Sequence, residues 1–297
     1  MNITLKQLRY LVAVADHASI TAAAQALFVS QPAVSSAVAQ IEQNIGAQLL
    51  LRYQAKGVAL TTVGRHVAAD ARRLLTHADE FAASAQQLGG SLTGPLTIGC
   101  FVTLSPFYLP SLLRAFVDSH PGIETVILEG TLSTLQTGLL DGECEIALMY
   151  GLELSDQIAF EPLIDIPPYV LLPRSHRLAR QPTIELRALA ADPMILLDLP
   201  HSREYFRSLF QAVGVDPVIR HRTQSFELVR GLVANGHGYS VLNLKPADDL
   251  TYEGTRLVSV NIADPVRALS IGLAWIRDAR LGRRAEAFAQ QCRLAFL

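Results

Sequence analysis

The chain has 297 residues, half of them apolar and 18% charged, a composition that excludes a disordered chain and is ample for two or three domains. No apolar run approaches the eighteen residues of a membrane span, and the first residues lack the features of a signal peptide. We therefore expect a cytoplasmic protein with no membrane partner. Cys100, Cys144 and Cys292 show neither disulfide nor metal-ligand spacing, which fits a reducing compartment.

The net charge of −2 gives no indication of a nucleic-acid partner, but the charge is unevenly distributed along the chain. Residues 1–60 carry a net charge of +2, residues 61–90 are neutral, and the remainder carries −4. A charge of +2 is a weak sign of DNA binding, so the motifs have to decide the question.

Three short helices are predicted at the N-terminus. The first follows Thr4 and the second follows Ser19, both of which are good N-caps. The third begins after Ser30, with Pro32 in its first turn, where a missing N–H costs nothing. Gly46 is a typical stop for this helix. Two short helices joined by a tight turn indicate a helix-turn-helix.

The face of the third helix opposite its apolar stripe carries small and amide side chains. Amides can make paired hydrogen bonds to adenine, serine hydroxyls serve several bases, and the helix N-terminus favours phosphate. The residues are Gln31, Pro32, Ser35, Ser36, Ala39, Gln40 and Gln43. Residues 49–61 predict a β-hairpin from which Arg52 and Lys56 would reach backbone phosphates. An ordinary three-helix bundle with a solvated polar face is the alternative, and the spacing favours DNA binding over it.

A long helix is predicted over residues 62–88, beginning after Thr61. Its apolar residues alternate steps of four and three, a heptad pattern: Val67, Ala71, Leu74, Ala78, Phe81, Ala85 and Leu88. Such a stripe often packs on its own domain. Here the hairpin before it and Gly89-Gly90 after it leave little local surface to cover it, which favours pairing with a second copy of the chain.

From residue 94 onward the pattern changes to alternating strands and helices, which is typical of an α/β fold with a mostly parallel sheet. The pattern repeats after Pro167-Pro168, and a last strand and a C-terminal helix near 282–296 close the chain. Two α/β lobes of similar make-up predict a cleft between them.

Residues 3–64 closely resemble the DNA-binding domain of LysR-type transcription regulators. The specific parts are LRYLVAVA, the pair Ala23-Ala24 with Leu27, SQPAVS at 30–35, IEQNIGAQLL, and Leu60-Thr61 with Gly64. The resemblance implies a winged helix-turn-helix joined to a linker helix that forms an antiparallel pair, often in a dimer of dimers.

The same resemblance implies base contacts from Gln31, Pro32, Ser35 and Ser36, and backbone contacts from Thr21 and from the wing around Arg52. The sequence departs from the family at position 36, which is often basic and is Ser here. This removes a charged contact and puts the pattern of base readout in doubt.

The second half resembles the effector domain of the same family, which has the fold of type 2 periplasmic binding proteins. The markers are GPLTIG at 94–99, LLDGECEIAL at 139–148, LLPRSHRLA at 171–179 and GHGYSVLN at 236–243. We therefore expect a DNA-binding domain at 1–60, a linker helix at 61–90 and an effector domain at 91–297. In the effector domain, crossovers near 163–168 and 261–267 would separate lobe I (94–163 and 267–297) from lobe II (168–262).

Ligands of open α/β sheets bind at the carboxyl ends of strands, beside helix N-termini. The candidate effector contacts at such positions are Cys100, Thr103, Thr131, Tyr150, Asp198, Ser202, Arg203, Phe226 and Tyr239. Individually, a Thr or Ser at a strand end more often caps the next helix. Facing hydroxyls and helix N-termini favour a small organic acid, and aromatic residues would form its wall. Asp198 opposes an anion unless it pairs with Arg203, so an amino acid is the alternative.

Other functions have less support in the sequence. A redox sensor needs an exposed, electropositive thiol, whereas Cys100 and Cys144 lie in apolar strand-like segments. An enzyme would show a nucleophile, zinc or phosphate-loop motif, and none is present, so we expect no catalytic residue, metal or cofactor. A solute-binding transport protein would need export. The expected partners are promoter DNA, a small-molecule effector and a second copy of the chain, with RNA polymerase as a further candidate.

Overall fold

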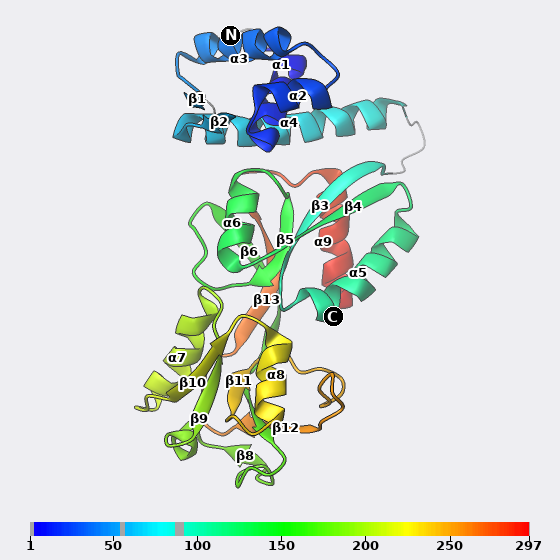
Figure 1. Cartoon of the computed structure of the whole chain (residues 1–297). Helices are drawn as coiled ribbons and strands as arrows, with labels where there is room; N and C mark the ends of the chain where they lie inside the picture. The colour runs from blue at the N-terminus through cyan, green and yellow to red at the C-terminus, as the bar shows by residue number, and fades with distance from the viewer. Residues whose placement is uncertain (1–2, 54–56, 87–91, 297) are drawn as a thin grey trace.

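The computed structural model describes residues 3–53, 57–86 and 92–296. Figure 1 shows a helical N-terminal part, the long helix α4 beneath it, and two α/β lobes that follow below α4. Lys56 and Leu88, two residues named from the sequence, lie outside the described residues, as does the side chain of Ala85. Within the described ranges, no helix combines the length and the apolar character that crossing a bilayer requires.

The N-terminal part consists of three helices and a hairpin: α1 (Leu5–His17), α2 (Ile20–Ala26), α3 (Gln31–Ile45), β1 (Leu50–Tyr53) and β2 (Gly57–Leu60). Thr4 and Ser19 cap α1 and α2 through their hydroxyls, as predicted. Ser30 has the extended backbone of an N-cap, but its side chain makes no capping hydrogen bond. Gly46 ends α3 in the left-handed conformation, which a glycine adopts without a steric cost.

The turn between α2 and α3 is held by its backbone. Val29 donates its N–H to the carbonyl of Ala24, and Phe28 donates to that of Gln25. This geometry places Phe28 at φ +54°, with 96% of the residue exposed. Left-handed backbone costs a bulky residue roughly 1–2 kcal/mol, so the turn is imposed on Phe28 by its neighbours.

One group of hydrogen bonds fixes the wing against α4 (Thr62–Gln86). Thr61 donates its N–H to the carbonyl of Leu49, and its hydroxyl accepts the N–H of Gly64, which caps α4. Glu42, on α3, accepts the N–H groups of Leu49 and of the residue after it. The end of α3, the start of β1 and the start of α4 therefore form one unit.

The apolar stripe of α4 lies in two different surroundings. Ala71 is buried and Val67 half-buried in the N-terminal core, because α1 packs along α4. Leu74 and Phe81 stay 50% and 75% exposed. The sequence argument that little local surface covers the stripe was thus wrong for its first turns, and it holds for Leu74 and Phe81.

Lobe I is built on a five-stranded sheet in the order β4-β3-β5-β13-β6. Figure 1 shows α6 on one side of this sheet and α5 with α9 on the other. The elements are β3 (Gly94–Phe101), α5 (Ser105–Ser119), β4 (Ile123–Gly130), α6 (Leu132–Leu140), β5 (Ile146–Tyr150), β6 (Ile158–Ile166), β13 (Leu269–Ile276) and α9 (Arg283–Ala295).

Lobe II contains a four-stranded sheet, β11-β7-β12-β8, and the pair β10-β9. The N–H of Ile195 and the carbonyl of Tyr239 join the two at 2.8 Å. The elements are β7 (Tyr169–Pro173), β8 (Thr183–Ile184), a 3-10 turn (Leu186–Leu189), β9 (Pro193–Leu197), α7 (Ser202–Ala212), β10 (Val218–Thr223), α8 (Phe226–Ala234), β11 (Ser240–Leu242) and β12 (Leu257–Ile262).

The sheets are mixed, so the prediction of mostly parallel sheets was wrong. In lobe I, β3 runs parallel to β4 and β5, whereas β13 is antiparallel to both β5 and β6. The reason is the connection between the lobes: β6 leads out of lobe I, and β13 returns from lobe II in the opposite direction. The chain crosses between the two sheets at residues 167–168 and 263–268.

The close approach of α4 to β1 makes a prediction about Gly64. A Cβ at this position would lie 2.1 Å from the carbonyl oxygen of Leu49. We expect Gly64→Ala to destabilise the N-terminal part by about 1–3 kcal/mol, as overpacking does. In Gly231→Ala on α8 the new Cβ meets nothing within 4 Å, and we expect a gain of up to about 1 kcal/mol from the better helix former. Urea unfolding of both variants measures the two changes, and equal effects would contradict this reading of Gly64.

Candidate functional site

The polar face of α3 is open to solvent in this chain. Gln31, Pro32 and Ser36 are exposed at its first turns, and Ser35 is half-buried. Further along, Gln40 is exposed, and its amide oxygen accepts a 2.6 Å hydrogen bond from the amide nitrogen of Gln7 on α1. Thr21 is exposed at the start of α2. These residues form a surface of short polar side chains without like charges, which suits hydrogen bonding to base edges and phosphates.

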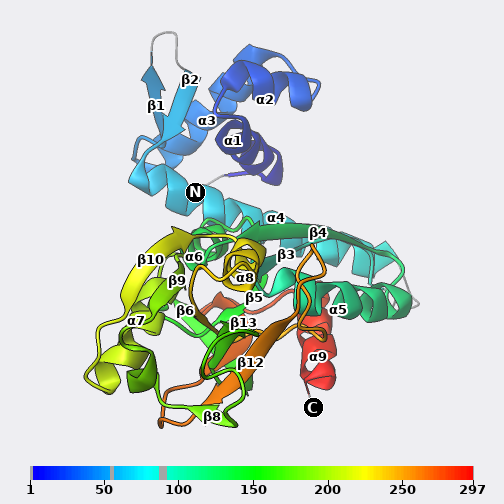
Figure 2. The same ribbon diagram turned by 60° about the horizontal axis from the view of Figure 1, so that its bottom comes forward.

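The wing stands beside this surface. Figure 2 shows the β1–β2 hairpin extending away from α4 next to α3. Arg52 is exposed on β1, opposite Val58. Gly57 has φ +82°, and a Cβ there would lie 2.6 Å from the carbonyl oxygen of Ala18, which also accepts the N–H of Val58. Gly57 is needed for this close contact, which sets the wing on the end of α1.

A small cavity lies between the two lobes. The volume open to the centre of a water molecule is about 20 Å³, which is room for roughly one water. Its lining is uncharged: Phe101, Thr103, Tyr150, Leu197, Ser202, Phe206, Phe226, Leu242, Asn243, Leu244 and Leu269. Apolar and aromatic walls with a few convergent polar groups are typical of small-molecule sites.

Four of the predicted effector contacts meet in this cavity: Thr103 and Tyr150 from lobe I, and Ser202 and Phe226 from lobe II. Burial raises the pKa of the Tyr150 hydroxyl, and a hydrogen bond from Thr103 opposes the rise. The Tyr150 hydroxyl therefore stays protonated at neutral pH and can donate as well as accept.

The other five predicted contacts lie elsewhere. Cys100 and Tyr239 are fully buried in the core, and the Thr131 hydroxyl caps α6 by accepting the N–H of Thr134. Asp198 and Arg203 form an ion pair with each other. None of these five is among the residues that line the cavity.

The Asp198 carboxylate is compensated on two sides. Arg203 donates to it through Nε, and Nη1 of Arg222 lies 3.7 Å from its second oxygen. Two cations therefore face one anion, so Asp198 does not present an unpaired negative charge to a ligand between the lobes.

At β11 the cavity is lined by Leu242, Asn243 and Leu244, at the carboxyl end of the strand, whereas Tyr239, which the sequence suggested, precedes the strand. The carboxyl-end rule applied to this strand would have found them. Leu269 is different, because β13 is antiparallel to β5 and so brings its first residues to the cleft. Only the sheet topology could have shown this.

Asn243 joins the cavity to both crossovers. Its amide nitrogen donates to the carbonyl oxygen of Ile166 and to the hydroxyl of Tyr205, each at 3.0 Å. The Tyr205 hydroxyl in turn donates to the carbonyl oxygen of Arg267 at 2.8 Å. Burial raises the pKa of Tyr205 to about 12, so this hydroxyl keeps its proton. Ile166 and Arg267 belong to the two ends where the chain leaves and re-enters lobe I.

A second contact between the lobes lies beside Ser202. The Nε2 atom of His201 is 3.0 Å from the hydroxyl of Ser133 on α6, and its Nδ1 atom bonds the Glu153 carboxylate. His201 and Glu153 both have left-handed backbone, at φ +66° and +45°. A hydrolase triad has the same Ser–His–carboxylate order, but Ser133 and Glu153 are exposed here, so we interpret the group as a tie between the lobes.

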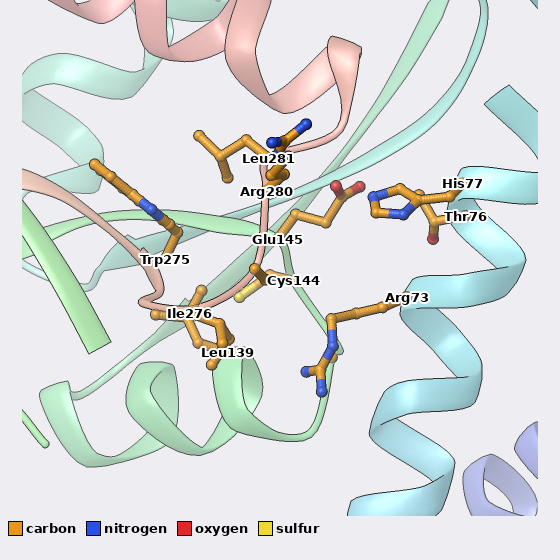
Figure 3. Close-up of a pocket in the computed structure, with 12 residues that line it drawn as sticks. Arg73, Thr76, His77, Leu139, Cys144, Glu145, Trp275, Ile276, Arg280 and Leu281 are labelled. Carbon is orange, nitrogen blue, oxygen red and sulfur yellow. The ribbon is translucent and has the colours of Figure 1, made fainter. Parts of the chain in front are cut away.

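Another hollow lies between α4 and lobe I (Figure 3). Arg73 and His77 extend into it from α4, and the Glu145 carboxylate points toward His77. Its floor is apolar: Leu139, Cys144, Trp275, Ile276 and Leu281. Beside it, Arg72 donates to the carbonyl oxygen of Asp141 at 2.6 Å and also pairs with Asp16 on α1. The linker helix thus contacts both halves of the chain.

Comparison with known proteins supports both halves of this description. Residues 5–65 match the family model described as bacterial regulatory helix-turn-helix protein, lysR family, and residues 89–296 match the LysR substrate binding domain. The regulator YnfL of Escherichia coli is 30% identical over 93% of both chains. The dual regulator OxyR of Escherichia coli is 28% identical over 99% of this chain and 95% of its own.

Solved structures agree with these matches. HinK, a LysR family transcriptional regulator from Pseudomonas aeruginosa, is 37% identical, with a TM-score of 0.67 over 99% of each chain. A full-length OxyR variant from Pseudomonas aeruginosa has a TM-score of 0.79 at 27% identity, over 99% of this chain and 98% of its own. With its helix-turn-helix, linker helix and two-lobed effector domain, the chain belongs to the LysR family of DNA-binding transcription regulators.

Proposed function

We propose that this regulator reads promoter DNA in the cytoplasm through α3 and the wing, and that a small organic acid bound between the lobes modulates this binding. The observation that carries the proposal is the interlobe cavity, in which Thr103, Tyr150 and Ser202 converge from both lobes. RNA polymerase would be the partner through which an activating form of the complex acts.

Gln31 is our candidate for direct base readout. It is the first residue of α3 and is exposed, so its amide can reach a base edge when the helix end enters the major groove. Pro32, Ser35 and Ser36 would flank it, while Thr21 and Arg52 would contact the backbone. A two-fold dimer would read an interrupted inverted repeat.

We expect Gln31→Ala to weaken binding to the cognate operator by about 1–3 kcal/mol and to leave binding to random DNA mostly unchanged, because only the base contact is lost. Gel-shift titrations on both DNAs measure this, with Gln181→Ala, an exposed glutamine of lobe II, as the control. An equal loss on both DNAs would refute base readout by Gln31.

An organic acid fits the polar atoms of the cavity. Ser202 is the first residue of α7 and is buried, so its hydroxyl lies at the end of the helix that carries a partial positive charge. Thr103 and Tyr150 offer hydroxyls from the opposite lobe. Phe101, Phe206 and Phe226 would enclose an apolar or aromatic body. The ion pairs of Asp198 remove the main objection to an anion.

Thr103→Val and Ser202→Ala should each lower the affinity for the best-binding acid by about 0.5–1.5 kcal/mol, the usual net value of one hydrogen bond. A thermal-shift screen of metabolites against the full chain identifies that acid, because a ligand of the folded state raises its melting temperature. Ser208→Ala, on the exposed side of α7, is the control. If the best ligand carries no carboxylate, the acid proposal fails. Unchanged affinity in both variants would move the site away from this cavity.

Two alternatives for the signal are an amino acid and an oxidant. An amino acid would use the same hydroxyls, but Asp198 does not line the cavity and is paired with Arg203 and Arg222, so it offers no partner for the ammonium group. The similarity to OxyR is the reason to consider an oxidant as the signal. Burial raises the pKa of Cys100 to about 11 and those of Cys144 and Cys292 to about 12. Protonated, enclosed thiols are the opposite of what a peroxide-reactive cysteine needs, which supports the small-molecule proposal.

LysR regulators oligomerise, and we propose that this chain does so through the exposed part of α4. Leu74 and Phe81 lie seven residues apart on one side of the helix and remain exposed, which a second copy of α4 would cover.

The double variant Leu74→Asp with Phe81→Asp should dissociate the oligomer, because it would bury charges without partners in the helix pair. Sedimentation velocity measures the change. Tyr252→Asp with Leu294→Asp serves as the control, since both residues are exposed apolar positions outside α4. If the α4 variant sediments like the parent, the self-association surface lies elsewhere.

A further inference from the structure

Asn243 lines the interlobe cavity and carries a buried amide oxygen without a hydrogen-bond donor. The residue is 9% exposed, and within the described part of the chain no group donates to its amide oxygen. A buried amide oxygen without a donor is costly, and such atoms are rare enough to call for an explanation.

The orientation of this amide is fixed by its neighbours. The carbonyl oxygen of Ile166 can only accept, so the atom 3.0 Å from it must be the nitrogen. The Tyr205 hydroxyl donates its only hydrogen to the carbonyl oxygen of Arg267. Toward Asn243 this hydroxyl can therefore only accept, so the Asn243 atom beside it is also the amide nitrogen. Both amide hydrogens therefore have acceptors, at Ile166 and at Tyr205 on α7, and the oxygen is the group of this amide that remains for a ligand donor.

Asn243 differs in this respect from the other polar groups of the lining. The hydroxyls of Thr103, Tyr150 and Ser202 can each turn to donate or to accept. They therefore tolerate either kind of ligand group, whereas the oxygen of Asn243 accepts only. A site built around such an atom discriminates strongly against an analogue that lacks the matching donor.

We propose that Asn243 determines the specificity of the interlobe pocket, and that the effector is a small hydroxy- or amino-substituted acid whose O–H or N–H donates to the Asn243 amide oxygen. This inference rests on the proposed function of the pocket. It narrows the acid to one with a donor group placed between its carboxylate and the crossovers, and it distinguishes such an acid from the unsubstituted acid of the same size.

The test uses the full-length chain and two matched series of probes. The first is propanoate, lactate, alanine and 2-methoxypropanoate, and the second is phenylacetate, mandelate, phenylglycine and α-methoxyphenylacetate. In each series the hydroxy and amino members carry a donor, the methoxy member offers only an acceptor, and the parent acid offers neither. Dissociation constants are measured by calorimetry for the parent protein and for Asn243→Leu, Tyr205→Phe, Thr103→Val and Ser202→Ala.

In at least one series a donor-bearing member should bind about tenfold or more tightly than the parent acid, and the methoxy member should bind no better than the parent acid. In Asn243→Leu the donor-bearing acid and the parent acid should bind with about equal dissociation constants. Tyr205→Phe removes one link of the same hydrogen-bond chain but leaves the amide oxygen of Asn243 in place. The preference for donor-bearing acids should therefore survive in this variant. This variant separates a contact to the ligand from a merely structural role, and it keeps the test decisive if Asn243→Leu folds poorly.

The proposal is overturned if donor-free acids bind equally well, if the preference persists in Asn243→Leu, or if Tyr205→Phe abolishes it. Absence of binding by every member up to tens of millimolar would also overturn it. If binding depends on Thr103 and Ser202 but shows no preference for donor-bearing acids, the ligand binds in the interlobe pocket but Asn243 does not determine its specificity. Binding that is indifferent to Thr103 and Ser202 would refute the pocket itself.

Discussion

One chain of hydrogen bonds joins the lobes at both crossovers, from Ile166 through Asn243 and Tyr205 to Arg267. It connects lobe II to the end of β6, where the chain leaves lobe I, and to the residues just before β13, where the chain returns. A change in the angle between the lobes has to pivot at these crossovers, so it acts directly on the residues of this chain. Tyr205 lies on α7, which also supplies Ser202 and Phe206 to the cavity. The pivot and the ligand surface are therefore carried by the same helix.

A second contact between the lobes is made in a different way. His201 and Glu153 meet across the lobes in left-handed backbone, a conformation that costs roughly 1–3 kcal/mol for each residue. The hydrogen bonds from His201 to Glu153 and Ser133 offset part of this cost. Backbone strain and hydrogen bonding thus oppose one another at this contact. A ligand that binds two arrangements of the lobes with different affinities shifts the equilibrium between them.

Much of this architecture could be predicted from the residues. Caps at Thr4 and Ser19, the stop at Gly46 and the heptad spacing of α4 are local signals, because each depends on neighbours within a turn or two. The antiparallel direction of β13 could not be inferred, because it is set by a crossover between segments that are distant in the chain. For the same reason the sequence did not show that Leu269 lines the cavity. The position of Asn243 after a strand could have been found from the sequence, but its contacts with Ile166 and Tyr205 could not, because these residues lie 77 and 38 positions away in the chain.

The packing of α4 has a consequence for exchanging parts between regulators of this family. Gly142 lies against α4, where a Cβ would be 3.1 Å from the carbonyl oxygen of Ala69, and Arg72 bonds the carbonyl oxygen of Asp141. The linker helix therefore packs along α1 and also contacts lobe I at the turn around Gly142. A chimera divided in the segment after α4 would pair this helix with a foreign lobe, and one divided before α4 would separate it from Thr61 and α1. Neither junction is neutral, so the α1–α4 surface or the turn around Gly142 has to be transplanted together with the helix.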